Sequence, residues 1–310
     1  MQAAFSKETF NLSIIIPAYN EARSLRLLIP QLTNLKGGLL MSGQRISEFP
    51  KNIEVIVACN GCTDGSAGVV KAFQKALSDD SQTEKAISVD LQLIEIDEAD
   101  KIQAINRGNE AASYFPRVLI DADIDIALPD VIFCASQLIK QQKKAASPAI
   151  RFNTSYCDKW VQLYYRAARH SSYNTTGLLS NVILLSEAGF NRVDPLPAVI
   201  ADDEYIRHQF SAEERLVIND VSFRFNCPKT VRSLTNVLTR VHRGNVQLST
   251  VIGPLTSTDK QKQELRQIFR KAGFSAFMTF MLLKCYVRFR VKLDIWMKRE
   301  PQWERDETTR

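Results

Sequence analysis

The stretch Arg117–Asp125 (RVLIDADID) organises the chain. Its apolar residues predict a short buried strand, and three carboxylates follow at alternate positions. Alternate side chains of an extended chain share a face, so Asp121 and Asp123 can point together beyond the strand. Two carboxylates there suit a hard divalent cation, Mg²⁺ or Mn²⁺, that carries a diphosphate. An acidic turn that caps a helix near Pro129 would explain the same three aspartates, and their spacing fits both interpretations.

Strand and helix patterns alternate on both sides of this stretch. In the first half, apolar runs predict strands at 12–17, 53–58, 91–96 and 118–120, with helices over about 25–35, 65–77, 101–113 and 129–143. The second half is less regular, with strands at 148–152 and 181–185, helices at 160–170, 202–210 and 259–271, and a hairpin or two short strands at 216–225. Such alternation predicts an α/β fold with a mostly parallel sheet.

Composition narrows the class of protein. The chain has 310 residues, 45% of them hydrophobic, which is enough for one large domain with an extension. The net charge is +6, but no basic stripe marks the first 230 residues, so we expect no nucleic-acid partner. The six cysteines are scattered and are expected to be reduced. Neither a signal peptide nor a spanning run of about 20 apolar residues is recognisable, which favours the cytoplasm.

Polar turns follow the first two predicted strands. Pro17-Ala18-Tyr19-Asn20-Glu21 lies where α/β proteins often bind a nucleotide, although a plain turn with Asn20 as helix cap fits equally well. After the second strand, Asn60-Gly61 predicts a turn, and the Asn60 amide could recognise a base edge. The Cys59-x-x-Cys62 spacing also allows a redox pair, which the following Thr-Asp-Gly-Ser makes unlike a thioredoxin site.

Taken in order, these segments resemble the signature of family 2 glycosyltransferases with the GT-A fold, in particular bacterial polysaccharide-type members. The resemblance covers about residues 11–130 and includes Lys101-x-x-Ala-x-Asn106-x-Gly108 before the Asp121-Ala-Asp123 motif. It implies a nucleotide-diphosphate sugar donor, a divalent metal and inversion at the anomeric carbon. It also places Pro17–Glu21 and Asn60 at the nucleoside, Lys101 by the diphosphate, and Asp121 and Asp123 at the metal. Many members carry Asp-Asp where this chain has Cys59-Asn60, so the identity of the donor's nucleobase is left open.

Two later motifs complete the resemblance. Asp203, with Asp202 next to it, matches the acidic motif that supplies the catalytic base, although acids at a helix start are also favoured by the helix dipole. Arg243 matches a late basic motif by the diphosphate, where a guanidinium can clamp phosphate oxygens. His242 is a possible third metal ligand. A surface basic cluster is the alternative explanation of this last motif.

The C-terminal part differs in character. Residues 272–283 carry no charge, and residues 284–299 then hold six basic residues against one acid. On a helix, Cys285, Tyr286, Phe289, Leu293, Trp296 and Met297 share one face, with the basic residues opposite. Such a helix can lie on an anionic membrane through residues 272–299, or it can pack on protein.

The sequence therefore predicts a GT-A domain over residues 1–255 and a helical extension over 256–310. The expected activity is inverting transfer of a sugar to a saccharide or lipid-linked acceptor in polysaccharide or glycoconjugate synthesis, in the cytoplasm or at the inner face of the membrane. Two rivals are a nucleotidyltransferase on a related fold and a non-catalytic sugar- or polymer-binding protein.

Overall fold

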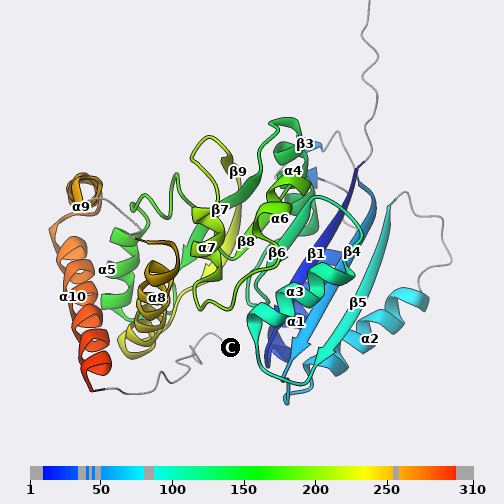
Figure 1. Cartoon of the computed structure of the whole chain (residues 1–310), viewed down its shortest axis with the longest axis horizontal. Coiled ribbons are helices and arrows are strands. Elements are labelled where there is room, and N and C mark those ends of the chain that lie inside the picture. The colour runs from blue at the N-terminus through cyan, green and yellow to red at the C-terminus, as the bar shows by residue number, and fades with distance from the viewer. Residues whose placement is uncertain are drawn as a thin grey trace, which may run out of the picture. The chain divides into compact units, whose positions relative to one another are not determined.

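The structure is a computed structural model that describes residues 10–33, 40–41, 44–45, 50–79, 87–253 and 258–297. Its centre is a seven-stranded sheet in the order β5-β4-β1-β6-β8-β7-β9 (Figure 1). The strands are β1 (Phe10–Ala18), β4 (Pro50–Asn60), β5 (Ser88–Ile96), β6 (Arg117–Ile120), β7 (Ala145–Asn153), β8 (Val182–Leu185) and β9 (Arg215–Asn226). The first four are mutually parallel, and β8 runs antiparallel to both β6 and β7. This confirms the predicted α/β fold with a mostly parallel sheet.

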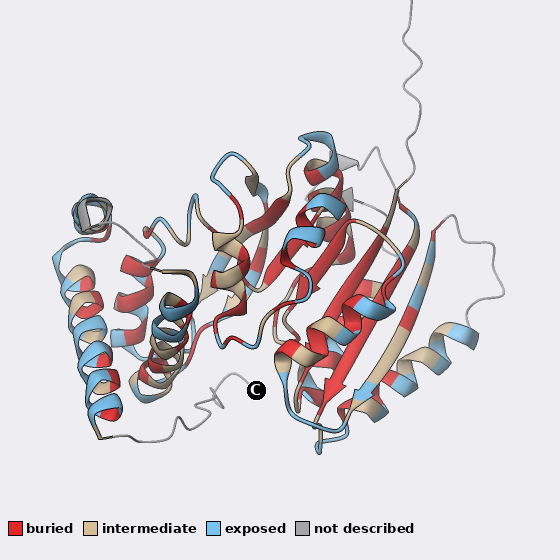
Figure 2. Cartoon of the chain, in the orientation of Figure 1, coloured by how far each residue is buried: buried red, intermediate tan, exposed pale blue. Residues whose placement is uncertain are grey.

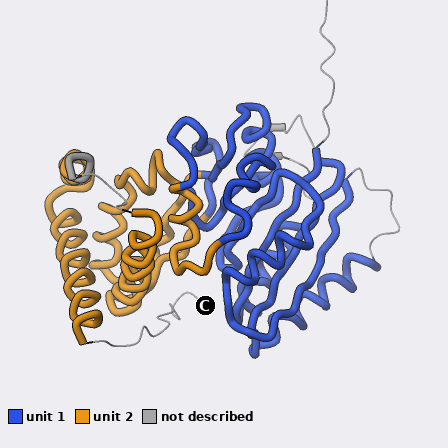
Figure 3. Tube along the Cα trace, viewed as in Figure 1, with its two compact units in different colours: residues 1–148, 179–196, 209–223 blue, residues 149–178, 197–208, 224–310 orange. Residues whose placement is uncertain are grey.

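The chain divides into two compact units, coloured separately in Figure 3. Unit 1 comprises residues 1–148, 179–196 and 209–223, and unit 2 comprises 149–178, 197–208 and 224–310. The division thus falls within β7 and β9. The predicted boundary at residue 255, between a catalytic domain and a helical extension, stays a prediction.

Unit 1 holds the parallel strands and five helices among its described residues: α1 (Ala22–Thr33), α2 (Ser66–Asp79), α3 (Lys101–Ala111), α4 (Leu128–Lys140) and α6 (Glu187–Val193). The middles of β1 and β4 are wholly buried, as Figure 2 shows, because apolar β-branched residues face helices on each side. Gly108 lets α3 approach β1 closely, since a Cβ there would lie 2.4 Å from Ile15 Cγ2. The carboxyl ends of the parallel strands, where polar turns follow, are therefore fixed by a rigid core.

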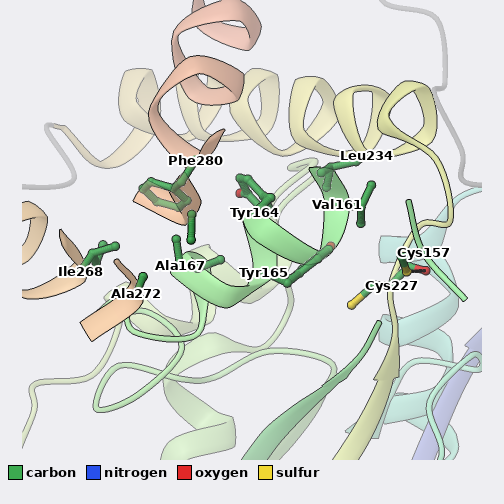
Figure 4. Close-up of a cluster of buried hydrophobic side chains, with 12 residues drawn as sticks. Cys157, Val161, Tyr164, Tyr165, Ala167, Cys227, Leu234, Ile268, Ala272 and Phe280 are labelled. Atoms are coloured by element: carbon green, nitrogen blue, oxygen red, sulfur yellow. Dashed lines mark hydrogen bonds between the residues drawn. The ribbon is translucent and has the colours of Figure 1, made fainter. Parts of the chain in front are cut away.

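Unit 2 is mainly helical in its described part, with α5 (Lys159–Ala168), α7 (Asp202–His208), α8 (Val231–Ile252), α9 (Thr258–Ala272) and α10 (Phe274–Trp296). Its core is built from aromatic and small side chains of these helices (Figure 4). Tyr164 on α5 stacks on Phe280 of α10, with ring centroids 5.4 Å apart. The last helices are therefore packed onto unit 2 by a hydrophobic core.

Two predictions need correction. Residues 216–225 form one continuous strand, β9, rather than a hairpin or two strands, because the backbone stays extended through Asn219-Asp220 although both residue types favour turns. The sequence assigned no strand to residues 36–52, which include a two-stranded ribbon, β2 (Leu40–Met41) with β3 (Gln44–Arg45), and the start of β4; the rest of this segment lies outside the described residues. Helices α6 and α8 were not predicted.

Candidate functional site

Hydrogen bonds brace the two turns that follow β1 and β4. Asn20 adopts a left-handed φ of 53°, and its Oδ1 accepts the Thr63 backbone N–H at 2.7 Å. The N–H of Glu21 donates to Ser66 Oγ at 2.8 Å, and the next N–H along the chain donates to Asp64 Oδ2 at 2.9 Å. Burial of Asp64 would raise its pKa, but its hydrogen bonds more than offset this, so the pKa is lowered and the carboxylate stays ionised.

Asn60 serves this brace directly. Its side chain is only 3% exposed, and its amide donates to the Ala18 carbonyl at 2.9 Å. Gly61 follows with φ +57°, and a Cβ there would lie 2.8 Å from the Ala99 nitrogen, so only glycine fits this turn. Asn60 therefore shapes the turn, and its contact with a nucleobase stays a prediction.

The other predicted nucleoside residues divide by exposure. Pro17, Ala18 and Glu21 are buried, whereas Tyr19 and Asn20 are part-exposed. Tyr19 and Asn20 are thus the side chains of this turn that can meet a ligand.

Asp121 is held by two donors at the carboxyl end of β6. Lys101 Nζ, at the start of α3, lies 3.0 Å from Asp121 Oδ1. Asn181 Nδ2 donates to Oδ2 at 2.9 Å, and the Asn181 carbonyl accepts the Asp121 N–H at 2.9 Å. Asn181 is itself left-handed, with φ 60°, a conformation that asparagine tolerates better than most residues. The side chains predicted at 101 and 121 therefore meet, and Asn181 joins them.

Asp123 lies two residues further on, within a turn. The Ile124 N–H donates to the Asp121 carbonyl at 3.2 Å, so the chain bends here instead of continuing extended. Asp121 and Asp123 are still both part-exposed, while Ala122 and Ile124 are buried. The predicted sharing of a face by the two carboxylates is thus compatible with the burial pattern, through a turn rather than a strand.

The residues at this end of β6 fit a divalent metal that takes most of its ligands from elsewhere. In the described part of the chain, no group of three or more His, Cys, Asp or Glu side chains is placed to hold a metal. Mg²⁺ and Mn²⁺ at phosphate sites commonly need only one or two carboxylates, because phosphate oxygens and water complete the shell. Both oxygens of Asp121 are held by Lys101 and Asn181, and the expected role of Asp121 and Asp123 as metal ligands stays a prediction.

Asp203, at the start of α7 in unit 2, is oriented on both oxygens. Tyr173 Oη donates to Asp203 Oδ2 at 2.7 Å, and the Glu204 N–H donates to Oδ1 at 2.8 Å. Asp203 is part-exposed, whereas the neighbouring Asp202 is 8% exposed. Of the two predicted base candidates, Asp203 is the accessible one.

A buried ion-pair network anchors the same short helix. Glu204 bonds Arg207 through both carboxylate oxygens, and His208 Nε2 lies 3.1 Å from Glu204 Oε1. Burial would raise the pKa of Glu204, but the bonds from Arg207 and His208 outweigh it and lower the pKa to about 2. The Arg207 guanidinium also lies 5.8 Å from the Tyr173 ring. The network thus connects both partners of Asp203.

Arg243 and His242, on α8, face the C-terminal helix α10. Arg243 Nη2 donates to Asp294 Oδ2 at 2.5 Å in a largely buried pair. The pKa of His242 is lowered by burial and then by Arg288 and other basic residues of α10. The basic residues of α10 oppose a divalent metal beside His242, and its role as a metal ligand stays a prediction. Arg243 ties α8 to α10 in this structure, and its role at a diphosphate stays a prediction.

Sequence reasoning missed Tyr173 and Asn181. Both are polar residues in irregular segments, and their partners are 30 and 60 positions away in the chain. The only local signal is at Asn181, which directly precedes an apolar run and is a residue type that tolerates positive φ.

Known proteins resemble this chain in sequence and in fold. The profile of Glycosyl transferase family 2 matches residues 13–176. Mannosyltransferase PcManGT from Pyrobaculum calidifontis, solved with GDP-Man and Mn²⁺, superposes with a TM-score of 0.59 at 16% identity, covering 94% of this chain and 88% of that one. Mannosyl-3-phosphoglycerate synthase from Rubrobacter xylanophilus gives a TM-score of 0.52 at 14% identity, covering 81% and 78%. No curated protein matches the sequence.

The profile match spans more than half of the chain and includes the braced turns, Lys101 and the Asp121-Ala-Asp123 motif. The similar structures share the fold over most of its length. This chain belongs to glycosyl transferase family 2.

Proposed function

We propose that this chain transfers a sugar from a nucleotide-diphosphate sugar to an acceptor hydroxyl, with inversion at the anomeric carbon and with Mg²⁺ or Mn²⁺ as cofactor. The observation that carries the proposal is the placement of Asp121 between Lys101 and Asn181, two residues before Asp123, at the carboxyl end of β6. Family membership supports glycosyl transfer as the reaction class.

On the donor side, the leaving diphosphate gains negative charge as its bond to the sugar breaks. A bound divalent metal would neutralise part of that charge. Asp123 would hold the metal together with phosphate oxygens and water. Lys101 adds a fixed positive charge, and because its ammonium lies 3.0 Å from Asp121, its position is defined before the donor binds. Asn181 keeps Asp121 in the orientation that the ion pair needs.

On the acceptor side, Asp203 takes the hydroxyl proton as the acceptor oxygen attacks the anomeric carbon. One C–O bond forms, the bond to the diphosphate breaks, and the proton ends on the carboxylate. Tyr173 and the Glu204 N–H each donate to one oxygen of Asp203, which fixes the orientation in which the carboxylate meets the acceptor. Asp202, which is buried, supports the helix start instead of meeting substrate.

The proposal includes a role in polysaccharide or glycoconjugate synthesis, with a saccharide or lipid-linked acceptor. It places the reaction in the cytoplasm, where nucleotide-activated sugars are made, with peripheral membrane contact through residues 272–299. Of the described residues, none belongs to a helix long and apolar enough to cross a membrane, so such contact would be interfacial.

Thermal stability with nucleotide diphosphates, with and without Mn²⁺, tests the donor site. A ligand at one hundred times its Kd stabilises the native state by about 2.7 kcal/mol, so one nucleotide should raise the Tm in a metal-dependent way. Asp123→Asn should abolish the metal-dependent part. Asp125→Asn, two residues further along the same segment, is the matched control and should retain it. No rise with any nucleotide would overturn the proposed donor site.

Turnover separates the rival functions. With a donor and a panel of acceptors, the glycosyltransferase releases a nucleoside diphosphate, and Asp203→Asn should lower kcat by at least a hundredfold while nucleotide binding persists. A nucleotidyltransferase would instead form pyrophosphate or a nucleotide-sugar. A sugar-binding protein would show ligand shifts with no product.

A further inference from the structure

Helix α10 is apolar on two separate faces. One face is buried: Ala276, Phe280, Val287 and Val291 pack toward α5 and α8. Its only acid, Asp294, is also on this side and pairs with Arg243. Attachment of α10 to unit 2 is therefore accounted for by this face alone.

The opposite face carries large hydrophobic side chains that are exposed, which we call the outer stripe. Figure 2 shows exposed and buried bands alternating along the helix. Phe289 is 66% exposed and Trp296 is 79% exposed. At 100° per residue, the members of the stripe lie within about 120° of one another. The outer stripe consists of Phe274, Met278, Leu282, Tyr286, Phe289, Leu293 and Trp296.

This face includes four of the residues that the sequence grouped together: Tyr286, Phe289, Leu293 and Trp296. Packing on the protein's own domain was one explanation of that grouping. In the structure that packing uses the other side of the helix. Within the described residues the stripe faces solvent. Single exposed apolar residues are common on protein surfaces, but a contiguous row of them marks an interaction site.

The charged side chains that α10 itself exposes beside the stripe are all basic. Arg288 and Lys292 are exposed along one edge of it, and Lys284 lies one turn before Arg288. Because Asp294 is buried, α10 presents no carboxylate on its exposed surface. An apolar strip with a purely basic margin is complementary to an anionic, apolar-cored surface.

The charge of the margin separates a membrane from a second copy of this chain. The stripe runs over 23 residues of helix, about 34 Å. A second copy seated on the same stripe would bring two basic margins together, and like charges across an interface oppose association. An anionic bilayer interface is complementary to that margin, and an amphipathic helix lies in it along its whole length.

We propose that the outer stripe of α10 inserts into the interface of an anionic lipid bilayer, with Arg288 and Lys292 on the headgroups. This deepens the membrane contact included in the proposed function, but it does not depend on catalysis. A failed activity assay and a failed binding assay therefore remain distinguishable.

Co-sedimentation of the full chain with vesicles tests the proposal. Vesicles of phosphatidylcholine with 30% phosphatidylglycerol should bind the protein, and phosphatidylcholine alone should bind it weakly. Replacing Leu282, Phe289 and Trp296 together by Ser should reduce partitioning about a hundredfold or more, because the apolar contact is lost. A matched control replaces three exposed apolar residues elsewhere by Ser and should leave binding unchanged; these are Leu27, Tyr156 and Trp160.

A charge variant tests the basic margin separately. Arg288→Ser with Lys292→Ser should weaken binding to anionic vesicles about thirtyfold, since each basic residue beside such a surface contributes about a fivefold factor. Added salt should weaken wild-type binding and have less effect on this variant.

Sedimentation velocity decides between lipid and a second copy. The wild-type protein should bind vesicles whatever its association state in solution. Equal vesicle binding by wild type and the Leu282/Phe289/Trp296 variant would overturn it. A dimer that this variant dissociates, without vesicle binding by wild type, would overturn it in favour of self-association.

Discussion

Glu204→Gln should destabilise unit 2 strongly and in a pH-dependent way. Glu204 is buried and bonded to Arg207 and His208, and its pKa is lowered from 4.5 to about 2. A pKa lowered by that much corresponds to about 3 kcal/mol of stability. The glutamine keeps the shape but cannot hold the Arg207 charge, so the free energy of unfolding at pH 7 should fall by about that amount.

The sign of the pH dependence follows from the direction of the change in pKa. Folding lowers the pKa of Glu204, so its contribution is complete above pH 4.5 and is lost as the pH falls toward about 2. The gap between wild type and Glu204→Gln should therefore narrow below pH 4.5, by up to about 1.4 kcal/mol per pH unit.

Denaturant titration followed by tryptophan fluorescence is the assay, because all three tryptophans lie in unit 2. The matched control is Asp158→Asn, which changes an exposed acid at the start of α5, in the same unit, where its side chain makes no capping hydrogen bond. That control should cost less than about 0.5 kcal/mol. A Glu204→Gln loss no larger than the control's, or a gap that stays constant from pH 7 to pH 4, would refute the reasoning.

Three further substitutions probe the site and its support. Tyr173→Phe removes a hydrogen bond to a charged carboxylate, so kcat should fall about ten- to a hundredfold with KM unchanged. Gly108→Ala should cost about 1–3 kcal/mol of stability, since the new Cβ would overlap Ile15. Lys101→Met should raise the Kd for a nucleotide diphosphate about tenfold in a binding titration.

Each of these has a control of the same type. Tyr156→Phe changes an exposed tyrosine and should leave kcat unaltered. Gly68→Ala on α2 places a Cβ in open space and should stabilise slightly, by about 0.5–1 kcal/mol. Lys71→Met breaks an exposed ion pair with Glu95 and should not affect nucleotide binding. A control as damaging as its test variant would count against the corresponding assignment.

The sheet could be predicted because buried parallel strands carry continuous β-branched runs that stand out in any window. Helix α8 was missed since its sequence contains Gly244 and many polar residues, and its burial depends on contacts such as that of Gly244 with Ala201, 43 positions away. Local pattern does not encode such contacts. The same physics explains β9, whose polar centre at Asn219-Asp220 resembles a turn in isolation.

The candidate site was predictable in its residue types and only partly in their roles. Lys101 and Asp121 were expected near the diphosphate, and the structure brings them together. Asn60 was expected to recognise a nucleobase because its amide has a donor and an acceptor; in the structure the buried amide donates to the Ala18 carbonyl, and the contact with a base stays a prediction. Burial is a property of the whole fold, which a single motif does not reveal. Arg243 donates to Asp294 on α10, 51 positions away in the chain, and no local motif indicates that pair.

The most direct test of the central claim is the anomeric configuration of the product. Wild-type chain would be incubated with Mn²⁺, the nucleotide sugar selected by the thermal panel, and saccharide or lipid-linked acceptors, and followed by proton NMR. Our account predicts release of nucleoside diphosphate together with a new glycoside of inverted anomeric configuration, and loss of that product in Asp203→Asn. A product with retained configuration, or formation of pyrophosphate, would contradict it.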